Sequence, residues 1–187
     1  GIAGTLAMAF GGIAGALALM SRYRDYVEKI LVLTGVPQKD AAAEAASVIE
    51  LETRIATASR PLVDMRDARG NFSAVETRGL GKQYRHLQLD DFLKVQGISD
   101  DAVSLANPAL FAQLDQFVGG LKPQQWKAYL RWRVGDAMAP YLAKPWRDAS
   151  FDFRGKVLRG ESQPAPRWQQ TLDAINLAAG PMLGREY

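Results

Sequence analysis

The chain contains no cysteine and a single histidine in 187 residues. Without cysteine it can form no disulfide bond, thiolate nucleophile or cysteine-ligated metal centre. The one histidine, His86, has no second histidine with which to bind a metal in a His-Glu-x-x-His pattern. We therefore expect His86 to be a surface or partly buried polar residue, and we assign no metal-ligating residue and no cofactor to this chain.

Signatures of catalysis are also lacking. The sequence has no phosphate-binding or dinucleotide-binding glycine loop and no Gly-x-Ser-x-Gly nucleophile turn. Two carboxylate pairs occur, Asp90-Asp91 and Asp100-Asp101, but adjacent side chains point apart on a helix and both pairs stand where helix caps are expected. No catalytic residue is predicted, and the chain's own residues indicate a non-catalytic helical module.

Charge is nearly balanced, with 23 basic and 20 acidic residues, so the net charge of +3 does not favour a nucleic-acid-binding protein. The distribution is uneven. Residues 121–167 carry ten Lys or Arg against four Asp or Glu, whereas residues 1–120 carry twelve against fourteen. The basic stretch is either a solvated face of a helical domain or a patch for an anionic partner.

The first twenty residues carry no charge and combine eight large apolar residues with eleven Gly or Ala. Twenty residues is the length of a membrane-spanning helix. Three interpretations remain open for this arm: a packed helix of the domain, a membrane or signal-type segment, or a segment that represents the native protein poorly. The chain also begins at Gly rather than Met, which suggests a processed product or a piece of a longer protein.

Hydrophobic periodicity predicts a mainly α fold, a multi-helix orthogonal or antiparallel array with little or no sheet. Ser21 is predicted to cap a helix that ends at Gly35, and a turn containing Pro37 is predicted to lead into an antiparallel helix to Ser59. Residues 61–82 are predicted to be a loop with one short helix. Residues 102–105 are the only strand candidate.

Further helices are predicted at 89–95, at 107–117 with Asn107 as the cap, at 123–141, at 145–158 and from Pro166, with a kink or stop before Pro181. The tryptophans on these helices are expected to lie mostly in the core. The apolar stripe expected to form the core face of the helix that begins at Pro123 is Trp126, Leu130, Val134, Ala137 and Tyr141. Glu52 lies near the apolar face of its helix, where an unpaired carboxylate is unfavourable. We therefore predict that Glu52 pairs with Arg66; the alternative is that both are solvated.

An ordered set of short motifs runs through residues 21–187. The motifs are Leu51-Glu52 with Ile55-Ala56, Arg66-Asp67, an apolar stretch 103–114, Tyr129-Leu130-Arg131-Trp132, Phe153 to Gly160, Arg167-Trp168, and Leu183 to Tyr187. In this order they resemble the helical second domain of the neprilysin-like, or endothelin-converting-enzyme-like, zinc metallopeptidases. The uncharged residues 1–20 and Pro181 depart from the family's pattern.

The resemblance implies a helical lid domain at residues 21–187, preceded by the arm at 1–20. In the family such a domain covers a catalytic domain that holds zinc and the general-base Glu, and it encloses a cavity that admits peptides. The expected partners are therefore the catalytic domain of the same parent protein and peptide substrates, with zinc in the parent, no nucleic acid, and a membrane contact possible through residues 1–20. The resemblance also implies an exported protein. It carries over only structural positions: Glu52, Arg66, Asp67, Trp126, Trp132, Gly160, Arg167, Trp168, Gly184 and Tyr187.

Our leading hypothesis is a substrate-gating helical domain or fragment of a zinc metalloendopeptidase, which would be inactive alone. The alternative is an independent helical interaction or membrane-associated module with no link to a peptidase. The sequence leaves peptide specificity and oligomeric state open.

Overall fold

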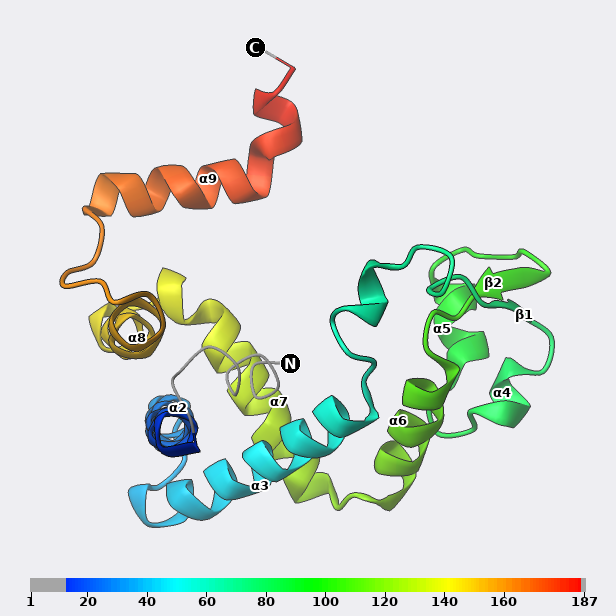
Figure 1. Ribbon diagram of the computed structural model, residues 1–187, viewed down its shortest axis with the longest axis horizontal. Coiled ribbons are helices and arrows are strands. Elements are labelled where there is room, and N and C mark those ends of the chain that lie inside the picture. Colours follow the sequence, from blue (N-terminus) through cyan, green and yellow to red (C-terminus); the bar gives the residue numbers. More distant parts are fainter. Residues whose placement is uncertain (1–12, 186–187) are drawn as a thin grey trace. The chain divides into compact units, whose positions relative to one another are not determined.

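The computed structural model describes residues 13–185 and divides into two compact units, one up to Ala137 and one from Met138 onward. Helices dominate both units, and the described residues contain one two-stranded sheet (Figure 1). The predicted mainly α fold is confirmed. Each unit is described by itself below.

The first unit is built on two helices of 21 residues each, α2 (Ile13–Leu33) and α3 (Gln38–Ala58). The turn between them uses Gly35 at φ +94°, a backbone conformation that glycine adopts without steric cost. Figure 1 looks down α2, whereas α3 runs across the view, so the two helices cross steeply and the predicted antiparallel pair is wrong. Ala41 and Ala45 of α3 are fully buried, and such small side chains let a neighbouring helix approach closely.

The start of α2 also differs from the prediction. Helix α2 runs continuously through Ser21, so Ser21 does not cap a helix there. The helix therefore includes the last eight residues of the uncharged arm. The remainder of the arm, residues 1–12, and the glycine and alanine stripe within it lie outside the described residues.

Two further helices, α6 (Pro108–Gly120) and α7 (Pro123–Met138), follow later in the sequence of the first unit. As predicted, Asn107 caps α6: its side-chain oxygen accepts a hydrogen bond from the Leu110 amide at 3.1 Å. Helix α6 packs against α3, and its one fully buried aromatic ring, Phe117, receives the Arg54 guanidinium of α3 at 4.3 Å from the ring centre.

The predicted core face of α7 is wrong. Leu130, Val134 and Tyr141 are all more than half exposed, and the residues buried on α7 are Ala128, Trp132 and Gly135. The buried stripe thus consists of two small residues around one tryptophan. A hydrophobicity pattern overlooks it because glycine and alanine add little to an apolar signal, although they allow close helix packing.

A smaller cluster lies between α3 and α6 in the sequence. It contains β1 (Ala74–Glu76) paired antiparallel with β2 (Ala102–Ser104), and the short helices α4 (Leu80–Gln83) and α5 (Leu89–Val95). Its core is Leu80, Tyr84 and Leu105. The strand at 102–105 is thereby confirmed, whereas its partner β1 falls in the segment predicted as a loop.

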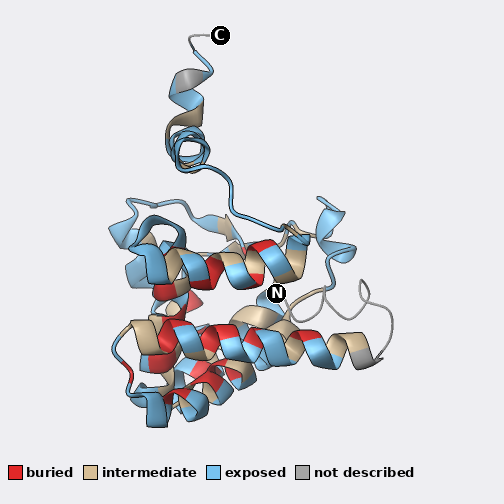
Figure 2. Cartoon of the chain, turned by 90° about the vertical axis from the view of Figure 1, so that its left-hand side faces the viewer, coloured by how far each residue is buried: buried red, intermediate tan, exposed pale blue. Residues whose placement is uncertain are grey.

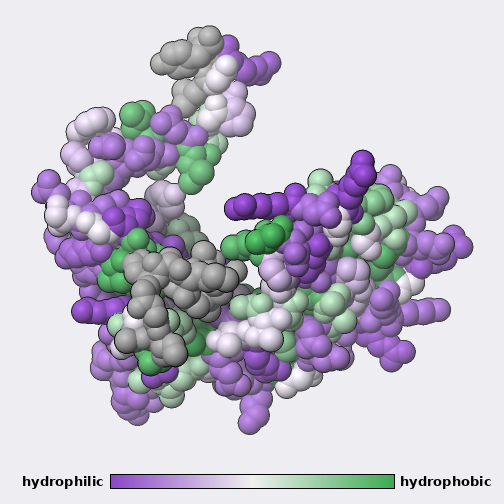
Figure 3. All heavy atoms as spheres, viewed as in Figure 1, coloured by the Kyte–Doolittle hydropathy of each residue, from purple (hydrophilic) through white to green (hydrophobic). Residues whose placement is uncertain are grey.

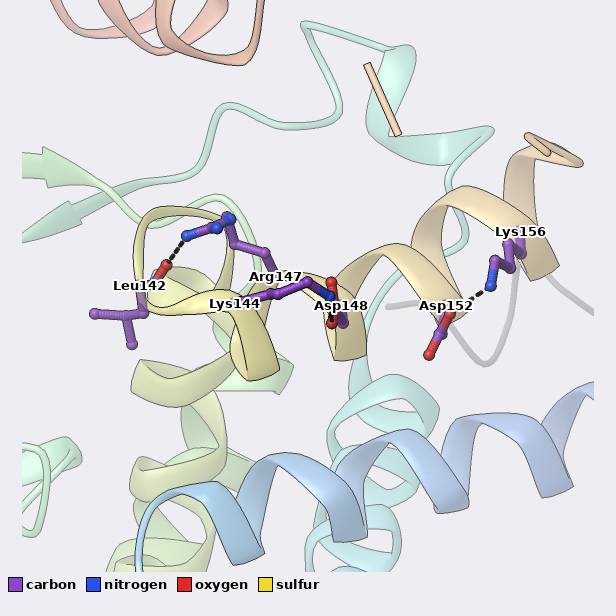
Figure 4. Close-up of polar contacts among 6 residues, drawn as sticks. All are labelled: Leu142, Lys144, Arg147, Asp148, Asp152 and Lys156. Atoms are coloured by element: carbon purple, nitrogen blue, oxygen red, sulfur yellow. Dashed lines mark hydrogen bonds and ion pairs between the residues drawn. The ribbon is translucent and has the colours of Figure 1, made fainter. Parts of the chain in front are cut away.

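Helix α8 (Lys144–Ser150) begins the second unit's main helical segment after a 3-10 turn, η2 (Ala139–Tyr141), and continues into a π-helix, η3 (Phe151–Val157). This confirms the predicted helix at 145–158. Figure 4 shows two i,i+4 ion pairs on its surface, Lys144 to Asp148 at 2.6 Å and Lys156 to Asp152 at 2.8 Å, and the bond from Arg147 to the Leu142 carbonyl.

The last helix, α9 (Arg167–Leu183), follows a turn in which Gly160 has φ +68°. Pro181 lies inside α9, where it can donate no backbone hydrogen bond, and the ribbon bends before its C-terminal end (Figure 1). The predicted kink is therefore present, although the helix does not stop. In Figure 2, α9 is pale blue over most of its length, in contrast to the red faces of the other long helices.

None of the helices in the described part of the chain is long and apolar enough to cross a membrane.

Candidate functional site

A polar centre joins the three long helices of the first unit at Glu52 of α3. The Glu52 carboxylate accepts a short hydrogen bond from the Tyr23 hydroxyl of α2, and its other oxygen accepts one from the Trp132 indole N–H of α7 at 3.1 Å. The guanidinium of Arg133 approaches the same carboxylate at 4.0 Å. One side chain thus receives bonds from both neighbouring helices.

Aromatic packing surrounds this centre. Tyr23 and Tyr26 stand three residues apart on one face of α2, and both rings meet the Trp132 indole edge to face, at centroid distances of 5.8 Å and 5.3 Å. The Tyr26 hydroxyl donates to Asp136, one turn further along α7, at 2.6 Å. Trp132 is 1% exposed, so its ring and its N–H are both used inside the core.

The electrostatics keep Tyr23 protonated. Burial raises the pKa of the Tyr23 hydroxyl well above its ordinary value, and the hydrogen bond to the Glu52 carboxylate and that carboxylate's charge raise it further. A phenol held neutral beside a carboxylate is a stable hydrogen-bond donor rather than a nucleophile or a proton source at neutral pH. The chemistry of the Glu52 centre is therefore structural: it fixes the mutual positions of α2, α3 and α7.

The predicted pairing of Glu52 with Arg66 is wrong. Arg66 is exposed in the 3-10 turn η1 (Asp64–Arg66), whereas Glu52 is satisfied by donors from α2 and α7. The adjacent Asp67 accepts a hydrogen bond from the Arg69 amide at 3.0 Å, within its own loop. Sequence distance misled the prediction, because Trp132 lies eighty positions from Glu52.

That loop is instead organised by Arg60, which the sequence did not single out. Its guanidinium donates to the carbonyl oxygens of Gly70 and Asp64 and to the Asn71 side chain, at 2.7–3.1 Å. The available signal was an arginine two residues after the end of a helix, followed by a glycine-containing loop.

The other structural positions are scattered. Trp126 packs edge to face on Tyr129, and its buried indole N–H has no hydrogen-bond partner in the described part of the chain. Gly160 occupies the positive-φ turn, Gly184 ends α9, and Tyr187 lies outside the described residues. Arg167 and Trp168 begin α9, but Trp168 is 67% exposed. The expectation that the tryptophans are mostly core therefore fails for Trp168.

The second unit contains a half-open cavity of about 740 Å³ between α8, η3, the turn after Gly160 and the start of α9. Basic side chains dominate its charged lining. Five cations line it: Lys144, Arg147, Arg154, Arg159 and Arg167. Three carboxylates oppose them: Asp148, Glu161 and Asp173.

Part of this charge is neutralised locally. Arg159 forms an ion pair with Glu161 at 2.6 Å, and its hydrogen bond lowers the pKa of that carboxyl group. Lys144 pairs with Asp148. Since the lining holds five cations and three carboxylates, the cavity keeps a surplus of two positive charges, which favours anionic over cationic groups. The basic stretch at 121–167 thus contributes partly to a concave surface rather than only to a solvated face.

Among the described residues, no three His, Cys, Asp or Glu side chains lie close enough together to hold a metal ion. His86 is exposed there, and its backbone amide donates to Asp115 of α6 at 2.7 Å.

The sequence profile of peptidase family M13 matches residues 15–187, which is nearly all of the chain. The chain belongs to peptidase family M13. The ordered aromatic, basic and glycine motifs of its C-terminal part had indicated this family, and the resemblance is confirmed.

Relatives of this M13 chain include proteins from insects. It is 26% identical to neprilysin-3 of Drosophila melanogaster over 180 residues, covering 89% of the chain and 22% of that protein. It is also 26% identical to the endothelin-converting enzyme homolog of Locusta migratoria, covering 90% of the chain and 25% of that protein. The chain therefore spans about a quarter of the length of the curated relatives it matches.

Solved structures show the same fold. The zinc metalloprotease Zmp1 of Mycobacterium tuberculosis, in its open state, superimposes with a TM-score of 0.82 at 22% identity, covering 91% of the M13 chain and 27% of that protein. Its complex with an inhibitor gives a TM-score of 0.78. At this level of identity the likeness establishes the fold alone.

Proposed function

We propose that this chain is the helical, non-catalytic portion of a zinc metallopeptidase that cleaves peptides, and that it shapes and gates the space through which substrates reach a catalytic domain elsewhere in the polypeptide. The observation that carries the proposal is the match to family M13 over residues 15–187, combined with a span of only a quarter of the relatives' length. Peptide hydrolysis and its zinc would then belong to the remaining three quarters.

The Glu52 centre supports the structural side of this role. A gating domain must keep its shape while substrates pass, and Glu52 fixes three helices through hydrogen bonds to Tyr23 and Trp132. The basic cavity of the second unit offers a concave surface for anionic groups of a peptide. An exported location is part of the same proposal and rests on the family resemblance.

The proposal that zinc binding and peptide hydrolysis belong to another part of the polypeptide is tested by comparing this chain with the full product of its gene. We expect stoichiometric zinc by elemental analysis, and peptide hydrolysis abolished by a zinc chelator, in the full product only. The chelator should leave the thermal unfolding midpoint of this chain unchanged. Tight zinc binding or hydrolysis by the 187-residue chain itself, or a full product without zinc-dependent hydrolysis, would contradict the proposal.

Gating is tested with peptides of increasing length and the full enzyme. Glu52→Gln keeps a hydrogen-bond acceptor but weakens the hydrogen bonds from Tyr23 and Trp132, which hold the three helices together. If these helices restrict access, kcat/KM for long peptides should rise relative to that for short ones. The matched control is Glu50→Gln, because Glu50 is exposed on the same helix. If the length preference of both variants equals that of the wild type, the Glu52 centre does not control access.

A further inference from the structure

Helix α9 carries an apolar stripe, but this stripe is exposed instead of packing against the core of its own unit. Trp168, Leu172 and Ile175 recur at spacings of four and three residues, which at about 100° per residue places them within an arc of about 60°. Such a stripe normally packs against a core. Here the three side chains are 67%, 48% and 47% exposed.

The opposite face of α9 is the one turned toward its own unit. Arg167, Gln170 and Asp173 line the basic cavity, and their arc is centred roughly opposite the apolar stripe. The Gln170 side chain also donates to the Ala165 carbonyl at 2.6 Å, which holds the helix to the preceding turn by its polar side. The part of α9 that lines the cavity is thus polar, and the exposed stripe of Trp168, Leu172 and Ile175 lies on the opposite side of the helix. Figure 3 shows green, hydrophobic spheres at the surface of α9.

An exposed apolar stripe that contains a tryptophan is more stable when another apolar surface covers it. Large exposed apolar patches on soluble proteins mark interaction surfaces, because their burial gives the main favourable free energy of association. The curated relatives are about four times longer than the aligned region, since it covers 22% and 25% of them. A longer polypeptide supplies packing partners at high effective concentration without any separate binding step.

We propose that the α9 stripe, defined as Trp168, Leu172 and Ile175, is an intramolecular docking surface buried by the part of the M13 polypeptide that lies outside this chain. The proposal rests on the proposed function in one respect, that this chain is a portion of a longer peptidase. In the whole protein, α9 then lies between the basic cavity on its polar side and a second packed layer on its apolar side. The occupant is an apolar helix or sheet face rather than a charged segment, because the stripe itself carries no charge.

The test uses thiol labelling, since the chain has no cysteine of its own. Leu172→Cys is made in this chain and in the full gene product, and modification at residue 172 is followed by peptide mass spectrometry, so that cysteines elsewhere do not interfere. The matched control is Asp173→Cys, an adjacent exposed residue on the cavity-facing side. We expect Leu172→Cys to react at least about tenfold more slowly in the full product than in this chain, and Asp173→Cys to change much less.

Equal labelling rates for Leu172→Cys in the two proteins would overturn the docking surface. If the full product is nevertheless a zinc-dependent peptidase, only this inference fails and the proposed function stands. If Leu172→Cys and Asp173→Cys are slowed equally in the full product, burial is not confined to the apolar face of α9, and the proposal is wrong. Protection that disappears on dilution, together with a dimer by light scattering, would identify a second copy as the occupant and also overturn the proposal.

Discussion

Trp132 and Trp168 belong to two motifs of the same ordered family set, yet they occupy opposite environments. Trp132 is 1% exposed, lies between two tyrosine rings and donates its indole N–H to a carboxylate. Trp168 is 67% exposed on α9. Residues of the first unit bury Trp132 completely, whereas the second unit leaves Trp168 and its neighbours on the apolar face of α9 uncovered.

The difference lies in what surrounds each ring. In the first unit, the apolar and polar requirements of Trp132 are satisfied by three helices. In the second unit, α9 lines the cavity with polar side chains and leaves Trp168, Leu172 and Ile175 exposed on the opposite side. The same residue type is therefore part of an internal core in one unit and part of the proposed docking surface in the other.

The largest expected effect comes from truncating each tryptophan in turn. Trp132→Ala should lower the free energy of unfolding of this chain by about 3–5 kcal/mol, because it leaves a large cavity and removes one of the two hydrogen-bond donors to the Glu52 carboxylate. Trp168→Ala should change it by less than about 0.5 kcal/mol, because the ring is mostly in solvent. Urea denaturation followed by circular dichroism measures both. Similar losses for the two variants would remove the contrast between the units.

A smaller loss is expected from removing the acceptor at the centre. Glu52→Ala removes the two oxygens that accept the hydrogen bonds from the Tyr23 hydroxyl and the Trp132 indole N–H, at a cost of about 2–3 kcal/mol. Glu50→Ala, an exposed change two residues away on α3, should stay within about 0.5 kcal/mol of the wild type. If Glu52→Ala is as mild as this control, the Glu52 centre does not stabilise the first unit.

Features of the fold that depend on one or a few neighbouring residues could be predicted from the sequence, whereas features that depend on packing between distant segments could not. The cap at Asn107, the turn glycine Gly35 and the bend before Pro181 follow from single residues and were all predicted. The buried face of α7 was not, because Ala128 and Gly135 carry little hydrophobicity and their burial depends on a tryptophan that fits between helices. The steep crossing of α2 and α3 likewise depends on tertiary packing.

The candidate site shows the same limit. Glu52 was recognised as a carboxylate that needs a partner, and this need is real. Its partners could not be derived, since Tyr23 and Trp132 are 29 and 80 positions away in sequence, and Arg66 was simply the nearer cation. The i,i+3 spacing of Tyr23 and Tyr26 was the signal that could have directed attention to α2.

The smallest effect concerns alkaline pH and again separates a buried group from an exposed one. Burial raises the pKa of Tyr23 in the folded chain, whereas an unfolded tyrosine loses its proton near pH 10. Because the folded state favours the protonated form, this stabilisation is complete below about pH 10 and is lost as the pH rises above it. At pH 11 the wild type should therefore have lost about 1 kcal/mol more stability, relative to pH 8, than Tyr23→Phe.

Tyr141→Phe is the control, since Tyr141 is 52% exposed, and its pH profile should match the wild type. A Tyr23→Phe profile that also matches the wild type would mean that the Tyr23 hydroxyl is not held in its neutral form by the packing around Glu52.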